Sequence, residues 1–384
     1  MKDSTTGPQC PHRPACDACP RFGASGIAPP AGAALQELAR EHGLPDVPVQ
    51  SGALFGFRHR ARLAIRGRLG APKIGLFEAD SHRVVHIPHC RVHHPLINEV
   101  AAVVRGALVD ARITCYSDRV HLGLARYLQV VIERRSQSAQ VVLVANSSTV
   151  APLTECLELI RSRLGPRLHS LWLNFNVEPN NVILGAGFYH HCGPQSVTEN
   201  FGGASVHYPP GAFGQSNLEV AQQIVDHIRD RVPRGSRVAE FYAGVGAIGL
   251  SLLDREDRVG RLWMNEVSPQ SLLGLQLGLA DLMPSLRDRV DVLAGPAAAA
   301  AEAALDGEVV IVDPPRKGLD MQLAQTLAAR PAQQLIYVSC ALASFLHDVR
   351  QLLAGDKLKL TELTAFNLMP FTAHVETVAR FERG

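Results

Sequence analysis

The sequence predicts an α/β protein: a mostly parallel sheet in the C-terminal half, preceded by a β-rich region and a small cysteine-rich segment. From about residue 206, strand-like runs alternate with helical runs, which is typical of a parallel sheet covered by helices on both faces. Between residues 52 and 150, short β-branched runs are separated by turns. The first 22 residues hold three of the eight cysteines and little that could form a core.

Composition is that of a soluble globular enzyme, with 46% hydrophobic and 19% charged residues in a chain of 384. No run approaches the ~20 apolar residues of a membrane helix, and the start, MKDSTTGPQC, has no apolar signal region. We therefore expect no membrane contact and a cytoplasmic location. Thiols stay reduced there, so the cysteines are interpreted as metal ligands, catalysts or core residues rather than disulfides.

The N-terminal cysteines have the spacing of a metal site. Cys10, Cys16 and Cys19 form C-x5-C-x2-C, and Cys90 is a distant fourth candidate. Such a set suits either structural zinc or a 4Fe–4S cluster, and spacing alone does not choose between them. Nearby histidines are interpreted as surface or RNA-facing residues: His89, His93 and His94. The other cysteines outside the C-terminal half have no partners at ligand spacing and are interpreted as packing residues: Cys115, Cys156 and Cys192.

Positive charge is concentrated between residues 51 and 135, where 14 Lys and Arg face 6 Asp and Glu. Such a basic region on a near-neutral chain suggests contact with a polyanion. Within FRHRARLAIRGR every arginine has an even number, so a strand would place them on one face: Arg58, Arg60, Arg62, Arg66 and Arg68. The other face would carry Phe57, Leu63 and Ile65 toward the core. A solvated face is the ordinary interpretation, and phosphate contact is the favoured one.

Four motifs follow strands of the predicted parallel sheet, where ligands of such sheets bind. The expected strands are residues 237–242, 261–266, 289–293, 309–312 and 334–338, with two more near 358–364 and 375–381. The first motif is Gly244-x-Gly246-x-x-Gly249, which suits a dinucleotide or S-adenosylmethionine. The second is Glu266, whose carboxylate could accept both ribose hydroxyls of a bound adenosine.

The other two motifs point to chemistry. In VVIVDPPRKG, Asp313 emerges from a buried strand and is stiffened by two prolines, as expected of a rigid group facing a planar base. In LIYVSC, Cys340 ends a buried strand just before a helix. A buried cysteine is usually inert. A helix N-terminus, however, lowers thiol pKa and favours a nucleophilic thiolate, so the residues alone leave both interpretations open.

Together these motifs resemble the RNA uracil-5 (m5U) methyltransferase family over nearly the whole chain. The resemblance rests on CPHRPACDACP, FGQSN, FYAGVG, Glu266, DPPRKG, YVSC and MPFTAHVETV, in the family's order. It implies a Rossmann-like S-adenosylmethionine-dependent methyltransferase domain. By the resemblance, the cofactor-binding residues are Gln215, Tyr242, Gly244, Glu266 and Asp313. Cys340 aligns with the family's nucleophile and Glu376 with its general base.

The chemistry of that family explains the last two assignments. Carbon 5 of uracil is a poor nucleophile until a thiolate adds at carbon 6, and a base must later remove the carbon 5 proton. The target must also leave its stack in folded RNA. The branch acting on 23S rRNA carries an iron–sulfur cluster with this cysteine arrangement, which favours a 4Fe–4S cluster, 23S rRNA as partner and a monomer. The implied regions are 1–95 (cluster and basic RNA contacts), 96–205 (β-rich) and 206–384 (catalytic).

Several positions depart from the family pattern: Glu240, Ala247, Gly295-Pro296 and Ala341-Leu342. They leave three alternatives open besides tRNA as the target. A cytosine-5 RNA methyltransferase would carry a second cysteine where this chain has Asp313-Pro314-Pro315. A dinucleotide-dependent dehydrogenase leaves DPPRKG and Cys340 unexplained. A non-catalytic RNA-binding relative is compatible with the changed cofactor positions.

Overall fold

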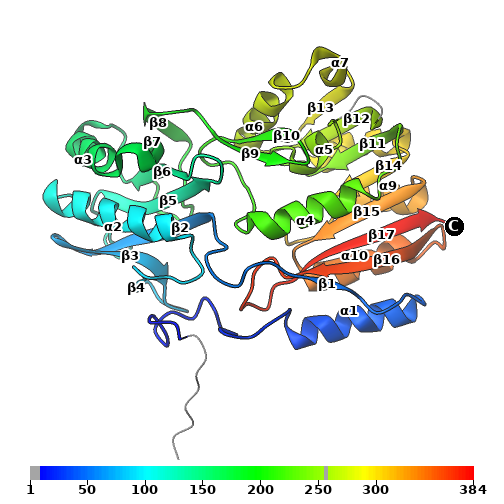
Figure 1. Cartoon of the computed structure of the whole chain (residues 1–384), viewed down its shortest axis with the longest axis horizontal. Coiled ribbons are helices and arrows are strands. Elements are labelled where there is room, and N and C mark those ends of the chain that lie inside the picture. Colours follow the sequence, from blue (N-terminus) through cyan, green and yellow to red (C-terminus); the bar gives the residue numbers. More distant parts are fainter. Residues whose placement is uncertain (1–8, 255–257) are drawn as a thin grey trace, which may run out of the picture. The chain divides into compact units, whose positions relative to one another are not determined.

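The computed structural model describes residues 9–254 and 258–384, which form two compact units (Figure 1). Unit 1 comprises Met1–Ala24, Ala53–Val197 and Gln215–Leu218. Unit 2 comprises Ser25–Gly52, Thr198–Gly214 and Glu219–Gly384. No helix in the described ranges is long and apolar enough to cross a bilayer.

Unit 1 is a seven-stranded sheet in the order β4-β3-β2-β5-β6-β7-β8. Its strands are β2 (Arg60–Arg68), β3 (Ala71–Phe77), β4 (Val84–His86), β5 (Ala125–Glu133), β6 (Ser138–Ala145), β7 (Leu168–Phe175) and β8 (Gly187–Cys192). Its helices are α2 (Pro95–Asp110) and α3 (Thr154–Leu164), with short 3-10 turns at Ala151–Leu153 and Gly165–Arg167. All neighbouring strands are antiparallel except β6 and β7.

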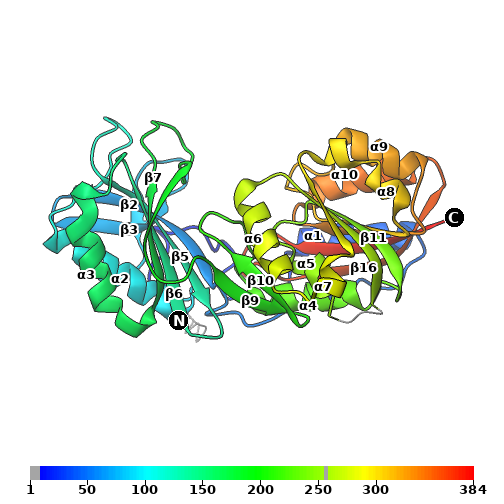
Figure 2. The same ribbon diagram turned by 90° about the horizontal axis from the view of Figure 1, so that it is seen from above.

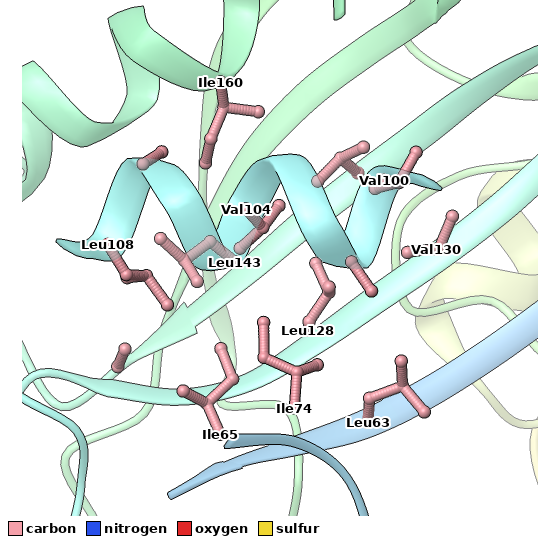
Figure 3. Close-up of a cluster of buried hydrophobic side chains, with 14 of the residues drawn as sticks. Leu63, Ile65, Ile74, Val100, Val104, Leu108, Leu128, Val130, Leu143 and Ile160 are labelled. Atoms are coloured by element: carbon pink, nitrogen blue, oxygen red, sulfur yellow. The ribbon is translucent and has the colours of Figure 1, made fainter. Parts of the chain in front are cut away.

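Helix α2 was not foreseen in a region predicted as strands. Its sequence explains it: the His94 side chain accepts a hydrogen bond from the Leu96 amide, Pro95 occupies the first turn, and apolar residues recur at helical spacing. Val100, Val104 and Leu108 pack against the sheet in the core of unit 1 (Figure 3). Leu63 and Ile65 of β2 lie in the same core, as predicted, and Phe57 is buried.

Unit 2 contains an eight-stranded sheet in the order β1-β16-β17-β15-β14-β11-β12-β13 and a two-stranded sheet of β9 and β10. The strands are β1 (Val49–Gln50), β9 (Val197–Phe201), β10 (Ala204–Tyr208), β11 (Ser236–Phe241), β12 (Val259–Glu266), β13 (Val290–Ala294), β14 (Val309–Val312), β15 (Gln334–Ser339), β16 (Leu358–Phe366) and β17 (Glu376–Arg383). In the large sheet only β17 runs against its neighbours. The predicted strand-helix alternation is confirmed.

Helices cover both faces of the large sheet, with α9 and α10 on one side and α4 on the other (Figure 2). They are α1 (Pro29–Glu41), α4 (Leu218–Arg229), α5 (Ala247–Ser251), α6 (Pro269–Ala280), α7 (Pro284–Arg287), α8 (Ala303–Asp306), α9 (Met321–Ala329) and α10 (Leu342–Leu353). The alanine-rich segment after β13 is a 3-10 turn (Ala297–Ala300) followed by α8.

Helix α1 begins within residues 23–34, a stretch whose many Gly, Ala and Pro residues are more typical of a flexible segment. Pro29 starts the helix, where its missing amide costs nothing. Ala31, Leu35 and Leu38 then bury one face of α1 in the core of unit 2. The burial of that face outweighs the weak helix preference of the composition.

Candidate active site

The carboxyl ends of β14 and β15 bring two predicted residues together. These parallel strands pair Val312 with Tyr337, so Asp313 and Cys340 leave neighbouring strands at the same edge. The antiparallel strand β17 pairs Thr377 with Ser339. Glu376, which precedes Thr377, therefore lies beside Cys340, which follows Ser339. The predicted nucleophile and base are neighbours.

The Cys340 thiol is half-buried, and its pKa is raised to about 11. Burial is the main cause, followed by the negative charges of Glu376 and Asp313, while Arg316 lowers the pKa. This corrects the expectation that the helix N-terminus would lower it. Helix α10 begins two residues later, at Leu342, and burial and the nearby carboxylates nevertheless raise the pKa of the thiol.

The pKa values of the two carboxyl groups, those of Glu376 and Asp313, are also raised. Glu376 is 7% exposed, and burial, reinforced by the charge of Asp313 and opposed by Arg316, raises its pKa well above the usual value. Burial raises the pKa of Asp313 to about 7. The charges of Glu376 and Asp313 thus act on Cys340, that of Asp313 also acts on Glu376, and Arg316 opposes both shifts. Such groups can hold and release protons near neutral pH.

The glycine loop follows β11. Gly244 and Gly246 have left-handed backbone angles (φ 60° and 88°), and Gly246 directly precedes α5. The third glycine has a different role: a Cβ on Gly249 would lie 2.2 Å from Oε2 of Glu240. Glu240 is 2% exposed, and burial, then the charge of Asp313, raises its pKa well above the usual value. Gly249 therefore makes room for a buried carboxyl.

Glu266 stabilises the same loop. Its Oε2 accepts a hydrogen bond from the Gly244 amide (2.7 Å), and its Oε1 accepts from the amides of Val267 (2.8 Å) and Ser268 (2.6 Å). Tyr242, at φ 61°, accepts a hydrogen bond on its hydroxyl from the Asp320 amide (3.0 Å).

Four of the five predicted cofactor residues thus lie along this edge: Tyr242, Gly244, Glu266 and Asp313. The fifth, Gln215, belongs to unit 1. Two residues near this edge were given no role from the sequence. Arg316 acts electrostatically on Cys340 and Glu376, and Asp348 accepts hydrogen bonds from the Tyr337 hydroxyl and the Leu319 amide. Arg316 lay within a motif already singled out, whereas Asp348 is an ordinary acidic residue inside a helix and gave no signal.

The N-terminal cysteines also come together. Cys10, Cys16, Cys19 and Cys90 are free, partly exposed thiols, and burial, then the charges of neighbouring thiols, raises the pKa of Cys16, Cys19 and Cys90. Burial raises the pKa of Cys19 to about 11, and the charges of Cys90 and Cys16 add to it. Within the part of the chain that the structure describes, no three His, Cys, Asp or Glu side chains have the arrangement of a metal-ion site.

Four sequence interpretations of unit 1 can be compared with the structure. His93 is not a surface residue: it is 6% exposed, and its Nδ1 lies 3.2 Å from Oδ1 of Asn98. Cys115 and Cys156 are core residues and Cys192 packs against the same core, as predicted.

The arginines of β2 do not form one exposed face. Arg60 and Arg66 are buried, whereas Arg62 and Arg68 are exposed. Arg66 is buried where it pairs with Asp118 and donates to the Tyr127 hydroxyl (3.3 Å), so alternation in sequence did not become uniform exposure. Arg58 is half-buried and acts electrostatically on Cys19 and Cys90.

A solved structure shares this architecture. The crystal structure of Pyrococcus abyssi tRNA (uracil-54, C5)-methyltransferase in complex with S-adenosyl-L-homocysteine superimposes with a TM-score of 0.76, covering 96% of this chain and 86% of that one. The identity is 21%. The fold is therefore an α/β methyltransferase fold.

Sequence comparisons identify the family of methyltransferases to which the chain belongs. Residues 303–383 match the family model described as tRNA (Uracil-5-)-methyltransferase. An uncharacterized RNA methyltransferase of Protochlamydia amoebophila is 32% identical over 382 residues, 97% of each chain. Another, from Geobacter sulfurreducens, is 29% identical over 84% of this chain and 65% of its own length. The chain belongs to the RNA (uracil-5-)-methyltransferase family and is an S-adenosylmethionine-dependent RNA uracil methyltransferase.

Proposed function

We propose that the protein methylates carbon 5 of a uridine through a covalent bond between the Cys340 sulfur and carbon 6. The single observation that supports this most is the register of β15 and β17, which sets Cys340 beside Glu376. A nucleophile and a base on the same side of one planar ring are what the two halves of the reaction need. Asp313, on the adjacent strand, completes the set.

The steps assign a task to each side chain. Cys340 loses its proton and adds to carbon 6, and the displaced electron pair makes carbon 5 nucleophilic. S-adenosylmethionine, when bound, supplies the electrophilic methyl group that carbon 5 takes. Glu376 then removes the carbon 5 proton, the ring double bond re-forms, and the carbon–sulfur bond breaks with its electron pair returning to sulfur.

The raised pKa values fit these tasks. A protonated Cys340 stays unreactive until its proton is taken, and Asp313, with a pKa of about 7, is suited to accept it at neutral pH. Glu376 binds a proton strongly because burial raises its pKa, which favours abstraction from carbon 5 once the group is ionised. The residues proposed to hold the cofactor are Gln215, Tyr242, Gly244, Glu266 and Asp313.

The test is label transfer from S-adenosylmethionine into ribosomal RNA and transfer RNA, separately, with wild type and Cys340→Ala. We expect transfer by wild type alone and 5-methyluridine in the product. Equal transfer by both proteins would rule out the covalent route, and transfer by neither would support a non-catalytic RNA-binding protein. A Cys156→Ala variant controls for loss of a thiol.

The preferred target is 23S rRNA, because of the cysteine cluster. Transfer RNA is the second candidate, favoured by the description of the matching family model and by the Pyrococcus abyssi enzyme's title. Mass spectrometric mapping of methyluridines in RNA from cells lacking the gene separates them. We further propose a cytoplasmic monomer in which residues 1–95 contact RNA, 96–205 form a β-rich region and 206–384 are catalytic.

We also propose that Cys10, Cys16, Cys19 and Cys90 hold a 4Fe–4S cluster. Four free thiols near one another suit it, since a cluster is wider than a single ion and needs thiolates farther apart, and the charges of Cys90 and Cys16 act on Cys19. Backbone amides of Val92 and His93 also donate to the Cys90 sulfur, which favours a thiolate. Iron and sulfide content after anaerobic purification tests this. Cys19→Ser should lose both, and Cys192→Ser should retain them.

A further inference from the structure

The loop that carries Asp313 and Arg316 is fastened at its far end by a buried carboxylate. Asp348 of α10 is 4% exposed. Its Oδ2 accepts hydrogen bonds from the Tyr337 hydroxyl (2.6 Å) and from the Leu319 amide (2.8 Å). One donor belongs to the strand that leads to Cys340, and the other directly follows the DPPRKG loop.

Gly318 fits against the same carboxylate. It has a left-handed backbone (φ 87°), and a Cβ added there would lie 2.5 Å from Oδ2 of Asp348. The next amide but one, that of Asp320, donates to the Tyr242 hydroxyl (3.0 Å) beside the glycine loop. The end of the DPPRKG loop is thus held from two sides, by α10 and by the residue that follows β11.

A second contact from α10 holds the middle of the loop. The Ser344 hydroxyl lies 2.9 Å from the Arg316 carbonyl and 3.0 Å from the Ala341 carbonyl, either of which it can donate to. Ala341 is the residue after Cys340. The first turns of α10 therefore contact both the backbone next to the thiol and the loop bearing the charged groups that perturb it.

The cost of burying Asp348 indicates that these contacts matter. Both hydrogen bonds that its Oδ2 accepts come from neutral donors. A polar carboxyl group kept from water is unfavourable compared with an apolar side chain of similar size. Burial, then the hydrogen bond to Asp348, raises the pKa of Tyr337, so its hydroxyl remains a donor. Packing alone would be served better by leucine.

We infer that Asp348 is a positioning residue, which fixes the loop bearing Asp313 and Arg316 relative to Cys340 so that the charged groups meet the target base correctly. This rests on the roles proposed above for Cys340 and Asp313. Asp348 itself touches neither base nor cofactor in this scheme. It acts through the loop, and only its capacity to accept two hydrogen bonds is required.

Two substitutions separate acceptor capacity from charge. Asp348→Asn keeps an oxygen that can accept both bonds, and Asp348→Leu removes it at similar volume. Gln351→Leu, on the exposed side of α10, is the matched control. Each is assayed for kcat and KM with labelled S-adenosylmethionine and total RNA from cells lacking the gene, and for the covalent adduct with RNA containing 5-fluorouridine, whose fluorine cannot leave as a proton does.

We expect Asp348→Leu to lower kcat and the rate of adduct formation by about 100-fold, as a small misplacement of reacting groups does, with KM for both substrates within about twofold. Asp348→Asn and Gln351→Leu should stay within about threefold of wild type in kcat, since correct loop placement survives. Folded Asp348→Leu with wild-type kcat would overturn the inference, as would an equal loss in Asp348→Asn.

If Asp348→Leu does not fold, Tyr337→Phe decides. It removes one of the two donors, and kcat should fall several-fold at unchanged KM; an unchanged kcat would count against the inference. Failure of the proposed function looks different, because wild type itself would then form no adduct.

Discussion

The surroundings of buried ionisable side chains differ between the two units. In unit 1, Arg66 forms a bidentate ion pair with Asp118, and its Nη1 donates to the carbonyls of Ile65 and Arg126. Burial alone would lower the pKa of Arg66, yet Asp118 outweighs it and the pKa is raised. In unit 2, burial raises the pKa of Glu240, Asp313 and Glu376, and the charge of Asp313 adds to the shift at Glu240 and Glu376.

The difference separates a structural charge from a reactive one. A buried charge with strong partners keeps its ionisation state at every ordinary pH and contributes to folding specificity. A buried acid with other acids among its nearest charges is poised to exchange protons, at a cost in stability. The carboxyl edge of unit 2 is of the second kind, and the middle of β2 is of the first.

The largest effect should come from Glu376→Gln. Loss of the base should slow turnover by about 100- to 10,000-fold, because the carbon 5 proton has no acceptor. Adduct formation comes earlier, so a methylated RNA–protein adduct should accumulate and be seen by mass spectrometry. The variant should also be at least as stable as wild type, because a neutral amide replaces a buried carboxyl group whose ionised form is disfavoured. Full turnover would place Glu376 outside the reaction.

Arg66→Met should show the opposite behaviour, a loss of stability. Removing one partner leaves Asp118 partly buried without its cation, at a cost of about 3 kcal/mol. The two tryptophans allow this to be assigned, since Trp172 lies in unit 1 and Trp263 in unit 2. Guanidinium unfolding in a Trp263→Phe background, followed by fluorescence, measures it. A loss of unfolding free energy below about 1 kcal/mol would mean that the Arg66–Asp118 pair contributes no more than an exposed ion pair does.

The sequence predicted the large sheet of unit 2 well and unit 1 poorly, for a physical reason. Buried parallel strands are continuous apolar runs, so β14 and β15 could be located almost to the residue, and the motifs at their ends came with them. In unit 1, α2 was missed because its apolar residues fit both a helix and a strand over short windows. The exposure of the β2 arginines was predicted wrongly because Arg66 is buried in an ion pair with Asp118, a residue far along the chain that the local pattern does not show.

The pKa of Cys340 was predicted in the wrong direction for a similar reason. The helix that follows it is visible in sequence. Glu376 and Asp313, which come from two other strands, act on the thiol only after the sheet has formed. Local signals report the helix dipole, and tertiary structure supplies the larger opposing effects.

The pH dependence of Cys340 alkylation tests that correction. With a pKa of about 11, the thiolate fraction rises about tenfold for each pH unit between pH 7 and 9, so the rate of iodoacetamide labelling should rise likewise. If the helix lowered the pKa of the thiol, the labelling rate would instead level off above about pH 8. Peptide mass mapping isolates Cys340 from the other thiols, with buried Cys156 as an internal control. Arg316→Gln should slow labelling further, because Arg316 lowers the pKa.

The smallest effect should come from Arg68→Gln, two residues from Arg66 on the same strand. Arg68 is exposed, so its loss should leave the unfolding free energy within about 0.5 kcal/mol of wild type. If it contacts a phosphate, RNA affinity should fall by a few-fold, and the slope of log affinity against log salt should decrease by about one. Filter binding across a salt series measures both. An unchanged slope would assign Arg68 to the ordinary solvated surface, while Arg66 on the same strand would remain structural.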